Sequence, residues 1–392
     1  MKFIHISDLH LGKQLHGYSL IEDQKHVLRQ IIAEMEKEEP DGLLIAGDVY
    51  DKAVPSAEAV GLLDDFLTEV TVRCPNTEVY LIGGNHDGPR RLEFAGRILE
   101  KHRLHLAGSA PDREHPDIVC HRLADEFGEV NIYLLPFLRA SHVRELFPEQ
   151  DILTCQDAYK ALIEREKIDP EKRNVLVAHQ FFTYGANGPV RCESESFSAG
   201  GLDATDVRTI FGGEEALFDY VALGHLHAPQ SVGRKYIRYS GSPLKYSVSE
   251  SGQRKSMTVV ELGEKGNVAL REIPFLPLRD VRLLEGTLAR LTDPATVKNG
   301  NAEDYVSVIL TDEEELYDPR SALEQCYPNL LEWRVENSRT RHAVEDMVLP
   351  DMNLSPIELF EEFYRMMQGC GLSEEEEAYL RDVFDAVEEK EN

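Results

Sequence analysis

Five short apolar segments of this chain are each followed by aspartate, asparagine or histidine residues, and this repeated arrangement constrains the fold more than any other feature. The clusters are Asp8-Leu9-His10, Gly47-Asp48, Gly84-Asn85-His86-Asp87, His179 and Gly224-His225-Leu226-His227. A single histidine or aspartate at such a position is usually structural, but five clusters after five predicted strands would require several coincidences. Because open α/β sheets bind ligands at the carboxyl ends of their strands, the pattern predicts that the clusters meet in one site.

The segments around the clusters alternate between helix and strand patterns. Apolar residues recur at helical spacing over residues 20–38, 56–70 and 92–102, which predicts three helices. Short β-branched runs predict strands at residues 3–6, 42–46, 78–82, 130–135, 174–178, 220–223, 236–239, 257–262 and 268–273. This alternation predicts a large α/β domain.

The rhythm of the sequence changes after Pro274 and Pro277. Strands are predicted at residues 281–284, 305–310 and 331–335, with loops and one helix between them, which indicates a small α+β domain. Beyond Ser355, two helical patterns are interrupted at Gly369-Cys370-Gly371, as is typical of a helical hairpin. We therefore expect an α/β domain over residues 1–277, an α+β domain over 278–350 and a helical hairpin over 351–392.

The chain is strongly acidic, with 71 Asp and Glu residues against 42 Lys and Arg residues and a net charge of −29. Residues 301–392 hold 25 of the acidic and 7 of the basic residues, so the acidity is concentrated there. By itself this charge argues against a nucleic-acid partner held by bulk attraction. The six cysteines form no CxxC pair, so neither a disulfide framework nor a thiolate zinc site is indicated.

Targeting and membrane signals are not evident in the sequence. No apolar run approaches the roughly 18 residues of a membrane helix. The first residues also lack the apolar stretch and cleavage signal of a secreted precursor. We therefore expect a cytoplasmic protein with no membrane partner.

The side chains in the five clusters are carboxylates, one amide and several imidazoles. These are hard or borderline ligands that suit manganese, iron or zinc. Two cations about 3.5–4 Å apart need a bridging carboxylate and open positions for a phosphate and a water molecule, and such centres catalyse in-line phosphoryl chemistry. The sequence therefore predicts a two-metal centre that acts on phosphate esters.

The order of the motifs, DxH, GD, GNH[DE], a lone histidine and GHxH, resembles that of the calcineurin-like metallophosphoesterase superfamily. A narrower resemblance, to the nuclease subunits of bacterial complexes of a nuclease with an ATPase, covers nearly the whole chain. It is carried by HISDLHLGK, GDVYD, IGGNHD, YVALGHLH and YSGSP, which begin at residues 5, 47, 82, 220 and 239. The resemblance implies a sandwich of two mixed sheets flanked by helices, followed by a small capping domain and the hairpin.

The resemblance also implies roles for individual residues. One metal would be held by Asp8, His10, Asp48 and His227, and a second by Asp48, Asn85, His179 and His225. Asp48 would bridge the two ions, for which manganese is the usual metal in the family. His86 would stand beside the scissile phosphate, and Asp87 would orient it.

The implied activity is that of a DNA nuclease, an exonuclease on double-stranded ends and an endonuclease on hairpins or single strands. The implied partners are DNA and an ATPase with a coiled coil, with the chain as a homodimer within a heterotetramer. Lys13, Arg90 and Arg91 lie beside metal motifs and are candidate DNA contacts. The apolar stripe of the tail is the candidate ATPase contact, comprising Phe360, Phe363, Tyr364, Met367, Leu380 and Phe384.

Two alternatives remain open on the sequence, and so does the role of the loop-like residues 183–201. A phosphoesterase for small phosphodiesters or phosphoproteins would share the metal ligands, although phosphoprotein phosphatases usually show GDxVDRG and GNHE where this chain has GDVYDK and GNHD. A scaffold with an inactive site is disfavoured because every expected ligand is present. The chain has no Walker-type GxxxxGK[ST] segment, so ATP hydrolysis must come from another chain.

Overall fold

The computed structural model describes residues 1–185, 188–195, 204–210 and 217–338, together with residues 360, 361, 364, 365, 372, 373, 376 and 380. The chain divides into two compact units. The first comprises Met1–Ile309 and Asp318–Trp333, and the second comprises Leu310–Tyr317 and Arg334–Asn392. Within the described residues, no helix combines the length and the apolar character that crossing a membrane requires.

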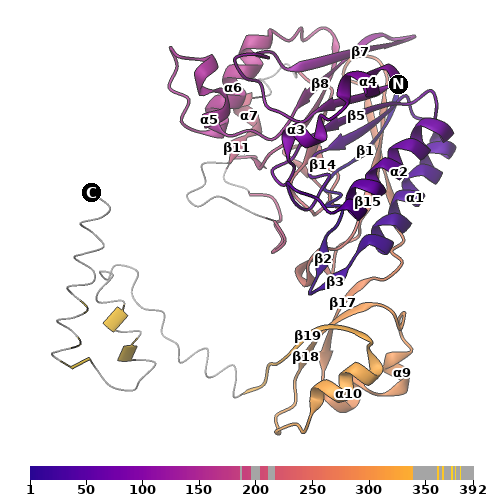
Figure 1. Ribbon diagram of the computed structural model, residues 1–392, viewed down its shortest axis with the longest axis vertical. Helices are drawn as coiled ribbons and strands as arrows, with labels where there is room; N and C mark the ends of the chain where they lie inside the picture. Colours follow the sequence, from indigo (N-terminus) through magenta and orange to yellow (C-terminus); the bar gives the residue numbers. More distant parts are fainter. Residues whose placement is uncertain are drawn as a thin grey trace. The chain divides into compact units, whose positions relative to one another are not determined.

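Two six-stranded sheets form the centre of the first unit (Figure 1). The first sheet has the order β16-β15-β1-β4-β5-β6, with strands β16 Val268–Pro274, β15 Ser256–Leu262, β1 Lys2–Ile6, β4 Gly42–Ala46, β5 Glu78–Ile82 and β6 Leu104–Ala107. Strands β1, β4, β5 and β6 run parallel, whereas β15 is antiparallel to both of its neighbours, so the sheet is mixed.

The second sheet is also mixed and has the order β13-β14-β12-β9-β8-β7. Its strands are β13 Gln230–Val232, β14 Arg234–Tyr239, β12 Tyr220–Gly224, β9 Arg173–His179, β8 Gly128–Leu135 and β7 Val119–Asp125. The central strands β8, β9, β12 and β14 are parallel. Pairs of short strands lie outside both sheets, namely β2 Gln14–Leu15 with β3 Tyr18–Ser19 and β10 Phe182–Thr183 with β11 Thr205–Asp206.

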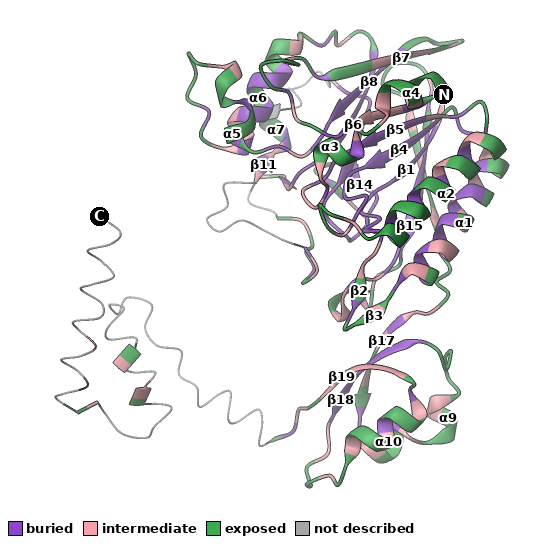
Figure 2. Cartoon of the chain, in the orientation of Figure 1, coloured by how far each residue is buried: buried purple, intermediate pink, exposed green. Residues whose placement is uncertain are grey.

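Helices cover the outer face of each sheet, and Figure 2 shows the strands between them largely buried. Helices α1 Ile21–Glu38 and α2 Ala57–Arg73 pack on the first sheet, in a core that includes Ile31 and Leu43. Helices α5 Ala140–Val143 and α6 Cys155–Glu166 pack on the second. A separate core, with Leu44 and Val177, fills the space between the sheets. The predicted sandwich of two mixed sheets flanked by helices is confirmed.

A three-stranded sheet with the order β17-β18-β19 follows the sandwich. Its elements are β17 Val281–Gly286, α8 Leu288–Leu291, α9 Pro294–Val297, β18 Tyr305–Leu310, α10 Pro319–Cys326 and β19 Asn329–Val335. Asp23, buried in α1, accepts a hydrogen bond of 3.0 Å from Arg279 Nε and one of 3.1 Å from the Tyr305 hydroxyl. The domain boundaries at 277/278 and 350/351 stay predictions, and most of the predicted hairpin lies outside the described residues.

One predicted helix, over residues 92–102, is wrong. The chain instead forms α3 Pro89–Leu92, α4 Gly96–Leu99 and a 3-10 turn, Glu100–His102. Ala95 adopts a left-handed conformation with φ of 61°, and the Glu93 carboxylate accepts the backbone N–H groups of Gly108 and Ser109 at 2.9 and 2.8 Å. These bonds to residues beyond the next strand outcompete the helical periodicity. The sequence analysis also missed β6, β7 and α6.

The two sheets approach each other closely where β4 and β12 end. A Cβ atom on Gly224 would lie 1.8 Å from the Ala46 carbonyl oxygen and 2.8 Å from His179 Nδ1. The same carbonyl oxygen is 2.8 Å from His179 Nδ1, so this ring spans the gap between the sheets. Only glycine allows this approach.

We predict that Gly224→Ala destabilises the protein by about 1–3 kcal/mol or more, because overpacking at this point must push the two sheets apart. Denaturant unfolding in the presence of EDTA measures the effect. Gly61→Ala is the matched control, because Gly61 is exposed within α2 and its added Cβ would meet nothing within 4 Å. That control should raise stability by about 0.5–1 kcal/mol. Equal unfolding midpoints for the two variants would contradict the prediction.

Candidate metal centre

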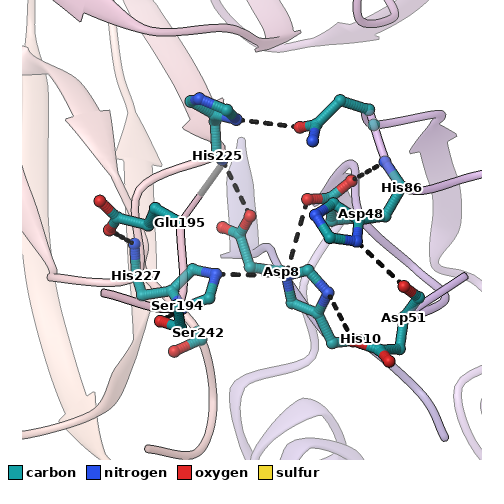
Figure 3. Close-up of polar contacts among 12 residues, drawn as sticks. Asp8, His10, Asp48, Asp51, His86, Ser194, Glu195, His225, His227 and Ser242 are labelled. Carbon is teal, nitrogen blue, oxygen red and sulfur yellow. Dashed lines mark hydrogen bonds and ion pairs between the residues drawn. The ribbon is translucent and has the colours of Figure 1, made fainter. Parts of the chain in front are cut away.

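Strand ends from both sheets bring the predicted residues together in one buried site (Figure 3). From the first sheet, Asp8 and His10 follow β1, Asp48 follows β4, and Asn85 and His86 follow β5. From the second sheet, His179 ends β9, and His225 and His227 follow β12. The meeting of the five clusters, predicted from the strand-end pattern, is therefore present in the structure.

Four residues of the site have left-handed backbone conformations that side chains other than glycine rarely adopt. The φ angles are 53° for Asp8, 43° for His10, 47° for Asp48 and 108° for His225. Backbone hydrogen bonds tie the first two loops together, since Asp8 N donates to Gly47 O at 3.0 Å and His10 N to Asp48 O at 2.9 Å. Strain of this kind is concentrated at functional sites, where the surrounding structure holds it in place.

Asp8, His10 and His227 form the first group of possible ligands, with one ligand atom of each within 4.8 Å of the others. The Nε2 atoms of the two histidines face each other at 3.2 Å. The buried Asp8 Oδ2 atom has no hydrogen-bond partner among the described residues. A buried carboxylate oxygen without a partner is costly unless a cation compensates it, so this group fits a bound metal ion.

Asp48 lies between the two groups. Its Oδ2 atom is 3.6 Å from His10 Nε2 and 3.4 Å from His179 Nε2, while its Oδ1 atom accepts the backbone N–H of His86 at 2.9 Å. Ligand atoms of Asp8, Asp48 and His179 also lie within 4.8 Å of one another. One carboxylate is thus within reach of ligands of both groups, as a bridging ligand requires.

Asn85, His179 and His225 form the second group. Asn85 Oδ1 is 3.0 Å from both His179 Nε2 and His225 Nδ1. His179 Nδ1 donates to the Ala46 carbonyl oxygen, which leaves Nε2 as the ligand nitrogen. His225 is also tied to the first group, because its backbone N–H donates to Asp8 Oδ1 at 2.9 Å.

The electrostatics of the site favour cations. Burial lowers the pKa of His10 well below its usual value and that of His225 to about 3, so both imidazoles are neutral ligands. Burial would also lower the pKa of His179, but the Asp48 charge raises it to about 9. Burial raises the pKa of Asp8. Carboxylate, amide and imidazole donors in a buried site fit two divalent cations of hard or borderline character.

A buried network behind His227 escaped the sequence analysis. His227 Nδ1 lies 2.8 Å from Ser194 Oγ and 3.3 Å from Glu250 Oε1, and its backbone N–H donates to Glu195 at 2.7 Å. Because the Ser194 hydroxyl donates to Glu250 at 2.6 Å, it accepts from Nδ1, which leaves His227 Nε2 to bind a metal. Lys255 donates to Glu250 and, at 2.8 Å, to the His227 carbonyl oxygen.

Little in the sequence could have identified this network. Ser194 and Glu195 lie in the segment 183–201, whose role the sequence left open, and Glu250 belongs to no recognised motif. The only hint in the sequence is that an acidic residue, Glu250, and a basic residue, Lys255, lie close together shortly after YSGSP. Acidic and basic residues at such a separation are common on protein surfaces, so this hint is weak. Both side chains are nevertheless buried in the structure.

Asp87 makes backbone contacts that the sequence did not predict. Its carboxylate accepts the backbone N–H groups of Val49, Tyr50 and Gly84 at 3.0, 2.8 and 2.9 Å. Burial raises the pKa of Asp87 to about 6. The Asp51 carbonyl oxygen lies 2.9 Å from Nδ1 of the His86 ring. Asp87 therefore joins the loops after β4 and β5, and its role in orienting His86 stays a prediction.

The candidate DNA contacts differ in their surroundings. Lys13 Nζ forms an ion pair of 2.9 Å with Asp51, whereas Arg90 and Arg91 are exposed on α3. The sequence analysis missed Arg139 and His142. Both line a cavity of about 440 Å³ whose wall also includes Asn85 and Asp87.

The candidate partner contacts lie in the second unit. Phe360 is 39% exposed, and the Tyr364 hydroxyl donates to Glu376 at 3.1 Å. Leu380 is among the described residues, whereas Phe363, Met367 and Phe384 lie outside them.

Comparisons with known proteins identify the family. Residues 1–229 match the family model described as calcineurin-like phosphoesterase, and residues 277–368 match one described as type 5 capsule protein repressor C-terminal domain. The chain is 32% identical over 395 residues to the SbcD subunit of the nuclease SbcCD from Staphylococcus epidermidis, and the match covers 100% of both chains. It is 30% identical over 394 residues to the protein of the same name from Staphylococcus saprophyticus, covering 100% of this chain and 99% of the relative.

A solved dimetal phosphatase from Danio rerio is 12% identical, with a TM-score of 0.39 over 69% of this chain and 95% of its own.

We predict that Asp48→Ala abolishes the binding of both divalent cations, because its carboxylate lies within reach of both ligand groups and its loss leaves the two charges unshielded. Metal analysis of the purified variant after dialysis against Mn²⁺ measures the stoichiometry. Asp64→Ala, which removes an exposed carboxylate from α2, is the matched control and should retain both ions. Two ions retained by Asp48→Ala would rule out the bridging role.

Proposed function

Since the chain belongs to the calcineurin-like phosphoesterase family, we propose that it is the metal-dependent nuclease subunit of an SbcCD-type complex. The observation that carries this function is the full-length similarity to two proteins named as SbcCD nuclease subunits. It extends beyond the phosphoesterase region, which a small-molecule or phosphoprotein phosphatase would not require. The alternative functions are therefore not favoured.

When bound, two cations supply a water molecule of lowered pKa and neutralise charge on the phosphate. We propose that Asp8, His10, Asp48 and His227 hold one of them and Asp48, Asn85, His179 and His225 the other. We also propose Mn²⁺ as the resident metal, because it is the usual metal of the family; the mixture of oxygen and nitrogen donors without thiolates is compatible with it.

His86 is the proposed catalytic residue. Its Nδ1 atom must carry a hydrogen, because the Asp51 carbonyl oxygen 2.9 Å away can only accept. Nε2 is then the nitrogen that takes up or releases a proton. His86 lies next to the ligands, since its ring centroid is 4.8 Å from that of His10. It can therefore protonate the leaving oxygen of the scissile phosphodiester.

The proposed substrate is DNA, with exonuclease activity on double-stranded ends and endonuclease activity on hairpins or single strands. The exposed Arg90 and Arg91, and Arg139 beside Asn85, supply positive charge near the centre despite the net charge of −29. Much of the acidity belongs to residues 301–392, which are not part of the centre.

The proposed partner is an SbcC-type ATPase with a coiled coil, bound through the C-terminal apolar stripe. A homodimer within a heterotetramer, located in the cytoplasm, completes the proposal. Phe94 and Ile98, which are 81% and 64% exposed, offer an apolar surface near α4 for a second copy of this chain.

We predict that His86→Ala retains both metal ions but lowers the rate of cleavage of labelled duplex and hairpin DNA by ~10²- to 10⁴-fold in Mn²⁺. Bis(p-nitrophenyl) phosphate separates the possible roles, because its leaving group needs no proton. Its cleavage should be affected far less than that of DNA.

The matched control for this experiment is His115→Ala, since the His115 side chain is 83% exposed. DNA cleavage by His86→Ala at the parental rate would exclude His86 as the acid. If the parent cleaved only the phosphodiester, both with and without the ATPase, the proposed nuclease function itself would be refuted.

We predict that deletion of residues 355–392 abolishes the complex with the ATPase and leaves the Mn²⁺-dependent nuclease activity of the isolated subunit largely intact. Co-purification and light scattering measure the complex and its stoichiometry. Phe360→Glu should weaken the complex, whereas Glu361→Ala, at the adjacent position, should not. A truncated chain that still co-purifies with the ATPase would disprove the role of the tail.

A further inference from the structure

A second cluster of metal-binding side chains lies at the edge of the sandwich, away from the motifs of the candidate metal centre. Strand β6 ends the first sheet and strand β7 ends the second. His105 of β6 and His121 of β7 have ring centroids 4.1 Å apart. Glu100, in the 3-10 turn before β6, completes the cluster, and one ligand atom of each residue lies within 4.8 Å of the others.

The His105 ring is held in a fixed position. Its Nε2 atom is 2.8 Å from Glu78 Oε2, and the ring stacks on Tyr80 with a centroid distance of 5.0 Å and an angle of 16° between the planes. The Nδ1 atom is buried and has no hydrogen-bond partner among the described residues. Because the Glu78 carboxylate accepts the hydrogen on Nε2, the lone pair of a neutral His105 ring is on Nδ1.

The second ring is neutral at neutral pH. Burial lowers the pKa of His121 to about 4, so His121 offers a lone pair. Two imidazoles and one carboxylate are a ligand set that binds zinc, with water in the fourth position. The contact of His105 with Glu78 is the carboxylate to histidine arrangement that orients metal-bound histidines in such sites.

A simple ion pair does not account for the whole cluster. Pairing of His105 with Glu78 uses Nε2 alone and leaves the buried Nδ1 atom without a hydrogen-bond partner among the described residues, which is costly. The ion pair also does not explain why the His105 and His121 rings lie with their centroids only 4.1 Å apart. A bound cation would satisfy Nδ1, explain the approach of His121 and pair with the exposed Glu100 carboxylate.

We propose that Glu100, His105 and His121 form a separate binding site for one borderline divalent cation of the zinc type, which joins the edge strands of the two sheets. The site shares no residue with the candidate metal centre and does not depend on the proposed nuclease function. Its role is structural, because the ion would connect β6 to β7, which do not pair with each other.

The test measures zinc bound to the full chain by equilibrium dialysis and metal analysis. His121→Ala should bind one equivalent less than the parent, whereas the exposed His115→Ala should bind as much as the parent. The double variant His121→Ala/Asp48→Ala should likewise bind one equivalent less than Asp48→Ala alone. In the presence of EDTA, His121→Ala should unfold at nearly the parental temperature, but zinc should raise that temperature less than it does for the parent.

Glu100→Gln provides a variant that cannot disturb the core, because Glu100 is exposed. This variant should weaken the zinc affinity of this one site by at least ~10-fold, since it removes a charged ligand. Replacing Glu78, which orients His105 without binding the ion, should lower the zinc affinity by ~10- to 100-fold. Unchanged zinc stoichiometry and affinity in both His121→Ala and Glu100→Gln would overturn the proposal. So would equal losses in His115→Ala.

Discussion

The Asp48 carboxylate is the interaction on which the arrangement of the candidate centre depends. It is buried between a histidine from the first sheet, His10, and one from the second, His179, and its other oxygen holds the backbone of His86. A buried charge of this kind is tolerated only when positive charge and hydrogen-bond donors surround it. Strands of both sheets therefore end beside Asp48, and the burial of this carboxylate links the fold to the site.

A second buried carboxylate, that of Glu250, fixes the position of the proposed ligand His227. Glu250 is fully buried, contacts His227 and Ser194, and is paired with Lys255, which also reaches the His227 carbonyl oxygen. Although burial would raise the pKa of Glu250, its contacts with His227 and Lys255 lower it well below its usual value. The network keeps His227 in one orientation and one tautomer, so the donor atoms are arranged before any cation arrives.

The sequence predicted most of the sandwich and the meeting of the ligands because both depend on local patterns, namely strand periodicity and the polar residue at each strand end. It failed where long-range contacts decide. The helix over residues 92–102 is broken because Glu93 bonds to Gly108 and Ser109, across the strand that follows. Glu250 could not be found because its partners Ser194 and His227 are far along the chain. The backbone contacts of Asp87 were not predicted either, because its three donors lie in two separate loops.

The left-handed conformations of Asp8, His10, Asp48 and His225 link cation supply to the lifetime of the folded chain. Each unfavourable backbone angle costs of the order of 1–3 kcal/mol. Without cations, the buried Asp8 Oδ2 atom also has no hydrogen-bond partner among the described residues. Ions that bind only the folded state stabilise it by mass action, by roughly 2.7 kcal/mol at 100 times the dissociation constant. A cell that withdraws its divalent cations would therefore both silence this protein and shorten its survival against proteolysis.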